Sequence, residues 1–172
     1  MWTFDYTAHR AFVAPAAEKS QIWRLIVGMI LIVGVFIGLG SLIYTLILQA
    51  LTSLSVGIDV ANVLSLLFSF GAASVGVFAT TYFVHSCRPG VIFGPIRATL
   101  AHFYLVALAM TALLVALAVL PPWGFDEPLI ANRAFWPWLL VLPIALISVL
   151  IQTSAEEILF RGYLQQHLGA RF

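Results

Sequence analysis

Two adjacent acids and a basic residue stand out near the end of this sequence, where Glu156, Glu157 and Arg161 follow a long apolar run. An ionisable side chain beside lipid is energetically expensive, so in such a segment it marks a functional site by default. A carboxylate can take a proton from water and return it to a leaving group, which is the work of a general base and acid. These three residues are therefore the candidates for chemistry.

The spacing gives the two acids different roles on a helix that turns about 100° per residue. Glu157 and Arg161 are four residues apart, so they share a face, and the acid precedes the base in the order that favours an ion pair. Glu156 points about 100° away from Glu157, so we expect Arg161 to neutralise Glu157 and to leave Glu156 without a cation. A carboxylate that is partly removed from water and lacks a cation holds a proton more readily, as general acid-base chemistry near neutral pH requires. The side chains that share or border the Glu156 side are Gln152, Thr153, Phe160 and Tyr163.

The depth of the motif is consistent with access from water. Trp136 and Glu156 are 20 residues apart, or about 30 Å of helix, which equals about one hydrocarbon thickness. With Trp136 at the outer interface, Glu156 lies at or just below the cytosolic one. The alternative interpretation is a helix end where charges simply begin, with Arg161 as a membrane anchor.

The composition places the chain in a lipid bilayer. Hydrophobic residues make up 62% of the sequence and charged residues 9%, and the mean hydropathy is +1.05. A soluble domain carries about 25% charged residues, so this chain cannot cover a water-facing surface. Four apolar segments reach the roughly 20 residues that a bilayer core requires, at about 22–51, 61–84, 99–120 and from Trp136 into the acidic motif. The sequence predicts an all-α, polytopic membrane protein with four transmembrane helices, forming a single membrane domain over residues 1–172.

Lysine and arginine residues predict the orientation. The loops expected at 52–60 and 121–135 contain one of them, Arg133, and the other seven lie on the opposite side: Arg10, Lys19, Arg24, Arg88, Arg97, Arg161 and Arg171. Because cytosolic loops carry the excess of basic residues, we expect both termini to be cytosolic. Residues 1–21 precede an apolar stretch too long for a signal peptide, so we expect a cytosolic tail there.

The histidines show no metal-ligand spacing. The sequence has no H-E-x-x-H pattern and thus no zinc site of its own, and its four histidines are His9, His85, His102 and His167. We expect His85 and His102, near the ends of the second and third spans, to be packing or interfacial residues. His167 shares the angular position of Glu156 but lies about 16 Å further along a continuous helix, so only a bend would bring them together.

Lipid is the partner that the sequence indicates most directly. The net charge of +1 and the lack of a basic stripe give no indication of nucleic-acid binding. Gly34 and Gly38 have GxxxG spacing, which predicts a close helix-helix contact, either within the chain or in self-association. Ordinary glycine usage in membrane helices is the alternative.

The run that begins at Glu156 resembles the first motif of the CPBP intramembrane protease family, which includes the type II CAAX prenyl endopeptidases and bacteriocin-processing or immunity proteins. The similarity covers Glu156-Glu157-xxx-Arg161 and the following Gly162-Tyr163-Leu164-Gln165-Gln166. EExxxR alone is a weak pattern. Its position at the cytosolic end of a span and the Gly-Tyr-Leu continuation make it more specific.

The resemblance implies an endopeptidase of the bacterial inner (cell) membrane, which hydrolyses a peptide or protein substrate near the cytosolic face. It implies that Glu156 activates a water molecule together with a histidine from a later helix, and that Glu157 and Arg161 are supporting residues. Family members have also been described as metalloproteases, and zinc here would require histidines that this chain lacks.

The sequence ends at Phe172, shortly after the motif. We therefore expect the chain to be the N-terminal part of a larger helical protease fold, with the motif-bearing part at about 136–172. As an isolated fragment we expect it to be inactive, since one carboxylate without oxyanion donors lacks most of the required groups. One alternative is a non-enzymatic membrane scaffold or bacteriocin-immunity-type protein of the same fold. Another is a transporter subunit with Glu156 on an ion path, but polar residues in the other spans are scarce.

Overall fold

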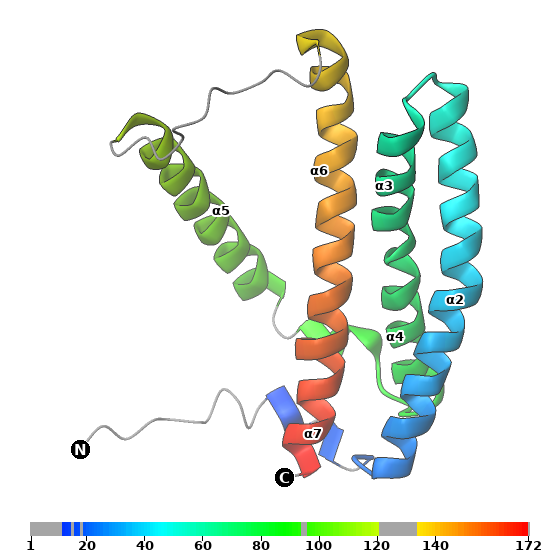
Figure 1. The fold of residues 1–172 in the computed structure, drawn as a ribbon. Coiled ribbons are helices and arrows are strands. Elements are labelled where there is room, and N and C mark those ends of the chain that lie inside the picture. The colour runs from blue at the N-terminus through cyan, green and yellow to red at the C-terminus, as the bar shows by residue number, and fades with distance from the viewer. Residues whose placement is uncertain (1–11, 15, 18, 94–95, 121–133, 172) are drawn as a thin grey trace. The chain divides into compact units, whose positions relative to one another are not determined.

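The computed structural model describes residues 12–14, 16–17, 19–93, 96–120 and 134–171. Every regular element in this part of the chain is helical, which confirms the all-α prediction (Figure 1). The elements are α2 (Ile22–Ser53), α3 (Ile58–Ser69), α4 (Gly71–Phe83), η1 (Pro89–Phe93), α5 (Ile96–Val119), α6 (Phe135–Glu157), η2 (Ile158–Leu164) and α7 (Gln165–Arg171).

Four helical segments among the described residues are long and apolar enough to cross a membrane: Ile22–Ser53, Ile58–Phe83, Thr99–Leu117 and Phe135–Arg171. Large apolar side chains remain exposed around them, as is expected where lipid takes the place of water. The prediction of a polytopic membrane protein with four spans is therefore confirmed. The cytosolic placement of the termini and the identity of the membrane stay predictions.

The chain divides into two units, Met1–Ile92 with Val141–Phe172, and Phe93–Leu140. Nothing in this division tests the prediction of a single membrane domain. The second unit contains α5, which is exposed along almost its whole length, and the start of α6, where the Phe135 ring contacts Trp136 and Trp138. Most of the expected loop at 121–135 and residues 1–11, 15 and 18 of the expected tail lie outside the described residues.

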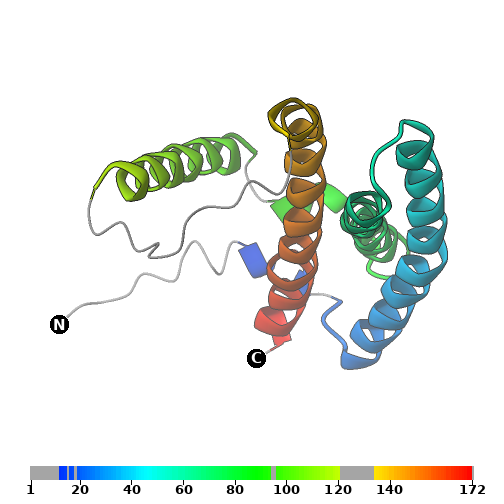
Figure 2. The ribbon, with the colours of Figure 1, turned by 45° about the horizontal axis from the view of Figure 1, so that its top comes forward.

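The first unit is built on α2 and the α3–α4 pair, which lie side by side and antiparallel (Figure 1, Figure 2). α2 has 32 residues, or about 48 Å, and is longer than a bilayer core of about 30 Å. The two backbones approach closely at Gly76, where an added Cβ would lie 3.1 Å from the Ile32 Cα. Ile32 and Val77 form the buried core here, together with Ile92 of η1 and Tyr163 of η2.

The last helical segment packs against this pair at two levels. Near the start of α3, residues Val141, Ile144 and Ala145 of α6 contact a core of Leu51, Ala61 and Leu64. Further along the same segment, Tyr163 enters the Ile32–Val77 core. The segment from α6 to α7 therefore contacts α2 and the α3–α4 pair at two places, through α6 and through Tyr163 of η2. The acidic motif lies between these two contacts.

The two glycines with GxxxG spacing make no such contact. A Cβ added at Gly34 or Gly38 would meet nothing within 4 Å, and both residues are exposed. Within the first unit, the interpretation of this pair as an internal contact is wrong, because the face of α2 that packs inward there carries Gly28 and Gly40 instead. Self-association through Gly34 and Gly38 stays a prediction.

Candidate functional site

The acidic motif lies where the helical geometry changes. α6 ends at Glu157 and continues without a break as η2, a π-helical stretch from Ile158 to Leu164, and then as α7. π-helical turns close i→i+5 hydrogen bonds, are rare, and occur frequently at functional sites. Each such turn holds more residues than an α-turn, so the side chains after Ile158 depart from the angles that a continuous α-helix gives.

The ion pair predicted within the motif is present. The Arg161 Nε lies 3.1 Å from a Glu157 carboxylate oxygen, and the side chains are 76% and 56% exposed, respectively. Glu157 is thus neutralised on the outer surface of the helix. A pair with this exposure contributes little to stability in water, so its main effect here is on charge.

Glu156 has different surroundings. No ion pair to Glu156 exists among the described residues. Its Oε1 accepts a hydrogen bond from the side-chain amide of Gln152, one turn earlier. The amide orients one carboxylate oxygen, and the other has no hydrogen-bond partner in the part of the chain that the structure describes. That second oxygen is available to a water molecule or to another ligand.

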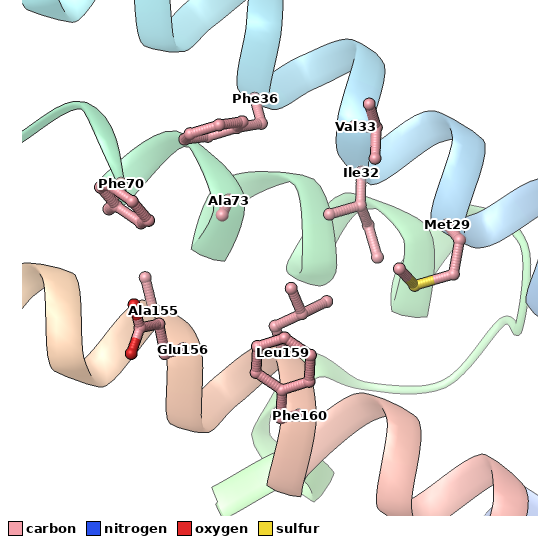
Figure 3. A pocket seen from close by; sticks show the side chains of 10 residues that line it. All are labelled: Met29, Ile32, Val33, Phe36, Phe70, Ala73, Ala155, Glu156, Leu159 and Phe160. Atoms are coloured by element: carbon pink, nitrogen blue, oxygen red, sulfur yellow. The ribbon is translucent and has the colours of Figure 1, made fainter. Parts of the chain in front are cut away.

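An apolar pocket of about 330 Å³ begins at Glu156. Its walls come from three elements in the first unit, namely α2, the α3–α4 junction and the α6–η2 segment (Figure 3). Glu156 is the only ionisable residue among the ten that line it: Met29, Ile32, Val33, Phe36, Phe70, Ala73, Ala155, Glu156, Leu159 and Phe160. A largely apolar cavity of this size with one polar group has the general character of a ligand-binding site.

Comparison with known proteins adds no identity to this geometry. The chain matches no protein-family model, no curated protein and no solved structure. The resemblance to the CPBP family therefore rests on the run from Glu156 to Gln166.

A second group of polar side chains, which the sequence did not predict, is buried where η2 and α7 meet the end of α4. The Tyr163 hydroxyl lies 3.0 Å from His85 Nε2, and the His85 and His167 rings are 4.0 Å apart. The three residues, which we call the His85 cluster, are 1% (His85), 0% (Tyr163) and 4% (His167) exposed. His85 is thus a packing residue, as expected, but it packs in a polar cluster.

The His85 cluster does not reach Glu156. Neither histidine lines the pocket or bonds to Glu156 in the described part of the chain. His102 is exposed on α5 of the other unit, and His9 lies outside the described residues. Tyr163, which a continuous α-helix would place near the Glu156 side, is turned into the core after the π-helical residues.

The surroundings of Glu156 do not fit a zinc ion. A zinc site takes at least three protein ligands from His, Cys, Asp or Glu, and the pocket walls offer Glu156 alone. The described residues contain no group of three such side chains that could hold a metal.

Proposed function

We propose that this protein is an intramembrane endopeptidase of the CPBP type, in which Glu156 activates water for attack on a peptide bond near the cytosolic membrane face. One observation supports it above the others. Of the two adjacent acids, Glu157 is paired with Arg161, whereas Glu156 has no cation partner among the described residues and lies at an apolar pocket. The Glu156 side chain is exposed, so water can reach it at the edge of this pocket.

The proposed step is hydrolysis with general base catalysis. The free oxygen of Glu156 takes a proton from a water molecule, and the water oxygen forms a bond to the carbonyl carbon of the substrate. The bond between that carbon and the amide nitrogen then breaks, and the proton passes from Glu156 to the leaving amine. Positioned proton transfer of this kind contributes about 10²- to 10⁴-fold to the rate.

The neighbouring residues have supporting roles in this proposal. Gln152 fixes the orientation of the carboxylate through its amide. The pair of Glu157 and Arg161 keeps a second negative charge away from the pocket. The histidine that works with the first glutamate in the family is assigned to a segment that the described residues do not include.

A non-enzymatic membrane protein of the same fold is the second candidate. The observation that favours it concerns two of the three histidines in the described residues. His85 and His167 are hydrogen-bonded to Tyr163 and do not contact Glu156. In this case the pocket would hold an apolar segment of a partner protein, and Glu156 would contact that segment without transferring protons.

The test is a peptide-cleavage assay in proteoliposomes that contain the protein expressed from its complete gene. A library of membrane-anchored peptides, analysed by mass spectrometry, requires no prior choice of substrate. We expect cleavage by the wild type, a loss of about 100-fold or more in Glu156→Gln, and nearly full activity in the matched Glu157→Gln variant. Equal activity of wild type and Glu156→Gln would end the proposed mechanism, and the absence of any cleavage by the wild type would favour the non-enzymatic candidate.

A further inference from the structure

The His85 cluster connects three separate parts of the first unit. His85 follows α4, Tyr163 belongs to η2, and His167 belongs to α7. Through the 3.0 Å contact between His85 and Tyr163, residues 78 positions apart in the sequence are held together. The cluster is thus the polar attachment of the C-terminal helical segment to the end of α4.

The hydrogen bonds define where the protons lie. His167 Nδ1 is 2.9 Å from the backbone oxygen of Tyr163, and because a carbonyl only accepts, Nδ1 carries the proton. The Tyr163 hydroxyl has His85 Nε2 as its partner, so the hydroxyl donates when Nε2 is unprotonated. The bond to Tyr163 therefore fits a neutral His85 whose proton is on Nδ1, a buried atom that has no hydrogen-bond partner among the described residues.

Among the described residues, the charged groups that act on His85 are all basic. Lys19 faces it from the N-terminal segment, Arg24 from α2 and His167 from α7, and the Arg24 guanidinium is held in place by a 3.2 Å bond to the Val84 carbonyl. The remaining titratable neighbours are Tyr163 and the Cys87 thiol, which lies 3.4 Å from the His85 carbonyl oxygen. No ion pair to His85 occurs in the described residues, so a charged His85 would be a buried cation beside other cations.

We infer that the His85 cluster is an acid-sensitive lock, which holds η2 and α7 against the end of α4 while His85 is neutral and releases them when His85 binds a proton. The lock would also act on the pocket, because Leu159 and Phe160 of η2 form part of its wall. This regulation does not depend on the proposed catalytic activity.

The electrostatics give the direction and range of the pH dependence. Burial, followed by the repulsion from His167, lowers the pKa of His85 from 6.5 to about 4. Above pH 6.5 His85 is neutral in both the locked and the released form. Between pH 6.5 and about 4 the released form binds a proton that the locked form does not, so release becomes more favourable as the pH falls. From pH 7 to pH 5 the equilibrium shifts toward release by up to about twentyfold.

Hydrogen exchange of the full chain in detergent, read by mass spectrometry, measures the release. We expect the protection factors of residues 158–171, corrected for the intrinsic effect of pH, to fall by up to about twentyfold between pH 7 and pH 5. His85→Gln keeps an acceptor for Tyr163 and removes the titration of His85, so the fall in its protection between the two pH values should be clearly smaller than in the wild type, with His167 as the remaining histidine of the cluster. His102→Gln, the matched control on α5, should behave as the wild type. Unchanged protection in the wild type, or the same fall in His85→Gln, would overturn the proposal.

A second measurement covers the case in which His85→Gln fails to fold. Nuclear magnetic resonance of wild-type protein labelled with ¹⁵N-histidine gives the protonation state of each ring. We expect His85 to remain neutral in the locked form at pH 5, because its pKa there is about 4. Titration of the His85 ring near its ordinary pKa of 6.5 in the locked form would contradict the lock.

Discussion

Gly28 is the position at which a single methyl group should disturb the His85 cluster most. Gly28 is buried in α2, and a Cβ added there would overlap the Tyr163 hydroxyl and lie 2.7 Å from the Thr80 Cγ2. Tyr163 is fully buried and bonded to His85. Its hydroxyl therefore cannot move aside without losing that bond, and we expect Gly28→Ala to destabilise the protein.

The expected free-energy change is the sum of three effects. Overpacking in a dense core costs about 1–3 kcal/mol. Separating the Tyr163 hydroxyl from His85 leaves buried polar groups unpaired, which costs about 1–3 kcal/mol. Alanine in place of glycine within a helix returns about 1 kcal/mol. The net loss is about 3 kcal/mol, which for a chain of this length lowers Tm by about 6–12 °C.

Thermal unfolding in detergent, followed by circular dichroism, provides the assay, and a double-mutant cycle assigns the cause. Tyr163→Phe removes the hydroxyl that the new methyl group would meet first. In that background Gly28→Ala should cost less, with a coupling of about 1–3 kcal/mol between the two positions. Gly34→Ala is the matched control on the same helix, because nothing lies within 4 Å of its added Cβ. Its Tm should be unchanged or slightly higher.

Two outcomes would refute this reasoning. An equal cost of Gly28→Ala with and without the Tyr163 hydroxyl would mean that the hydroxyl does not lie beside Gly28. Equal effects of Gly28→Ala and Gly34→Ala would mean that the two faces of α2 do not differ in packing.

Two other substitutions test the η2 contact and the pocket. The Cβ of Gly162→Ala would overlap Ile92, so this variant should lower Tm by the equivalent of about 1–3 kcal/mol. The control Gly90→Ala should leave Tm unchanged, because nothing lies within 4 Å of its added Cβ. Equal Tm values for the two variants would contradict the contact between η2 and η1. Ala73→Phe places a ring in the pocket beside Glu156 and should reduce peptide cleavage by about tenfold, equivalent to about 1.4 kcal/mol, at nearly unchanged Tm. Full cleavage in a folded Ala73→Phe variant would argue against substrate binding in this pocket.

The features that the sequence predicted correctly are those that depend on neighbouring residues. The four spans follow from composition and length, because a bilayer core sets how many apolar residues a helix needs. The pair of Glu157 and Arg161 follows from their four-residue separation, and this part of the helix is close enough to α-helical for the pair to form.

The features that the sequence did not predict depend on tertiary contacts and on the π-helical residues. Tyr163 and His167 come after Ile158, where the α-helical angles no longer apply. Their partner His85 lies on a different helical segment, and the closeness of Tyr163 to α2 depends on a glycine at position 28. The spacing of Gly34 and Gly38 predicts a face of α2 without large side chains. It does not predict whether another helix packs on that face.

The central claim is that Glu156, and not Glu157, is the carboxyl group at the apolar pocket that is free to react. Dicyclohexylcarbodiimide, an apolar reagent that partitions into membranes and modifies carboxyl groups there, tests it directly in proteoliposomes with peptide mass spectrometry. The structure predicts that the adduct accumulates on Glu156 while Glu157, paired with Arg161, stays unmodified, and that Ala73→Phe slows the reaction. Modification of Glu157 first, or of both acids at the same rate, would contradict the claim.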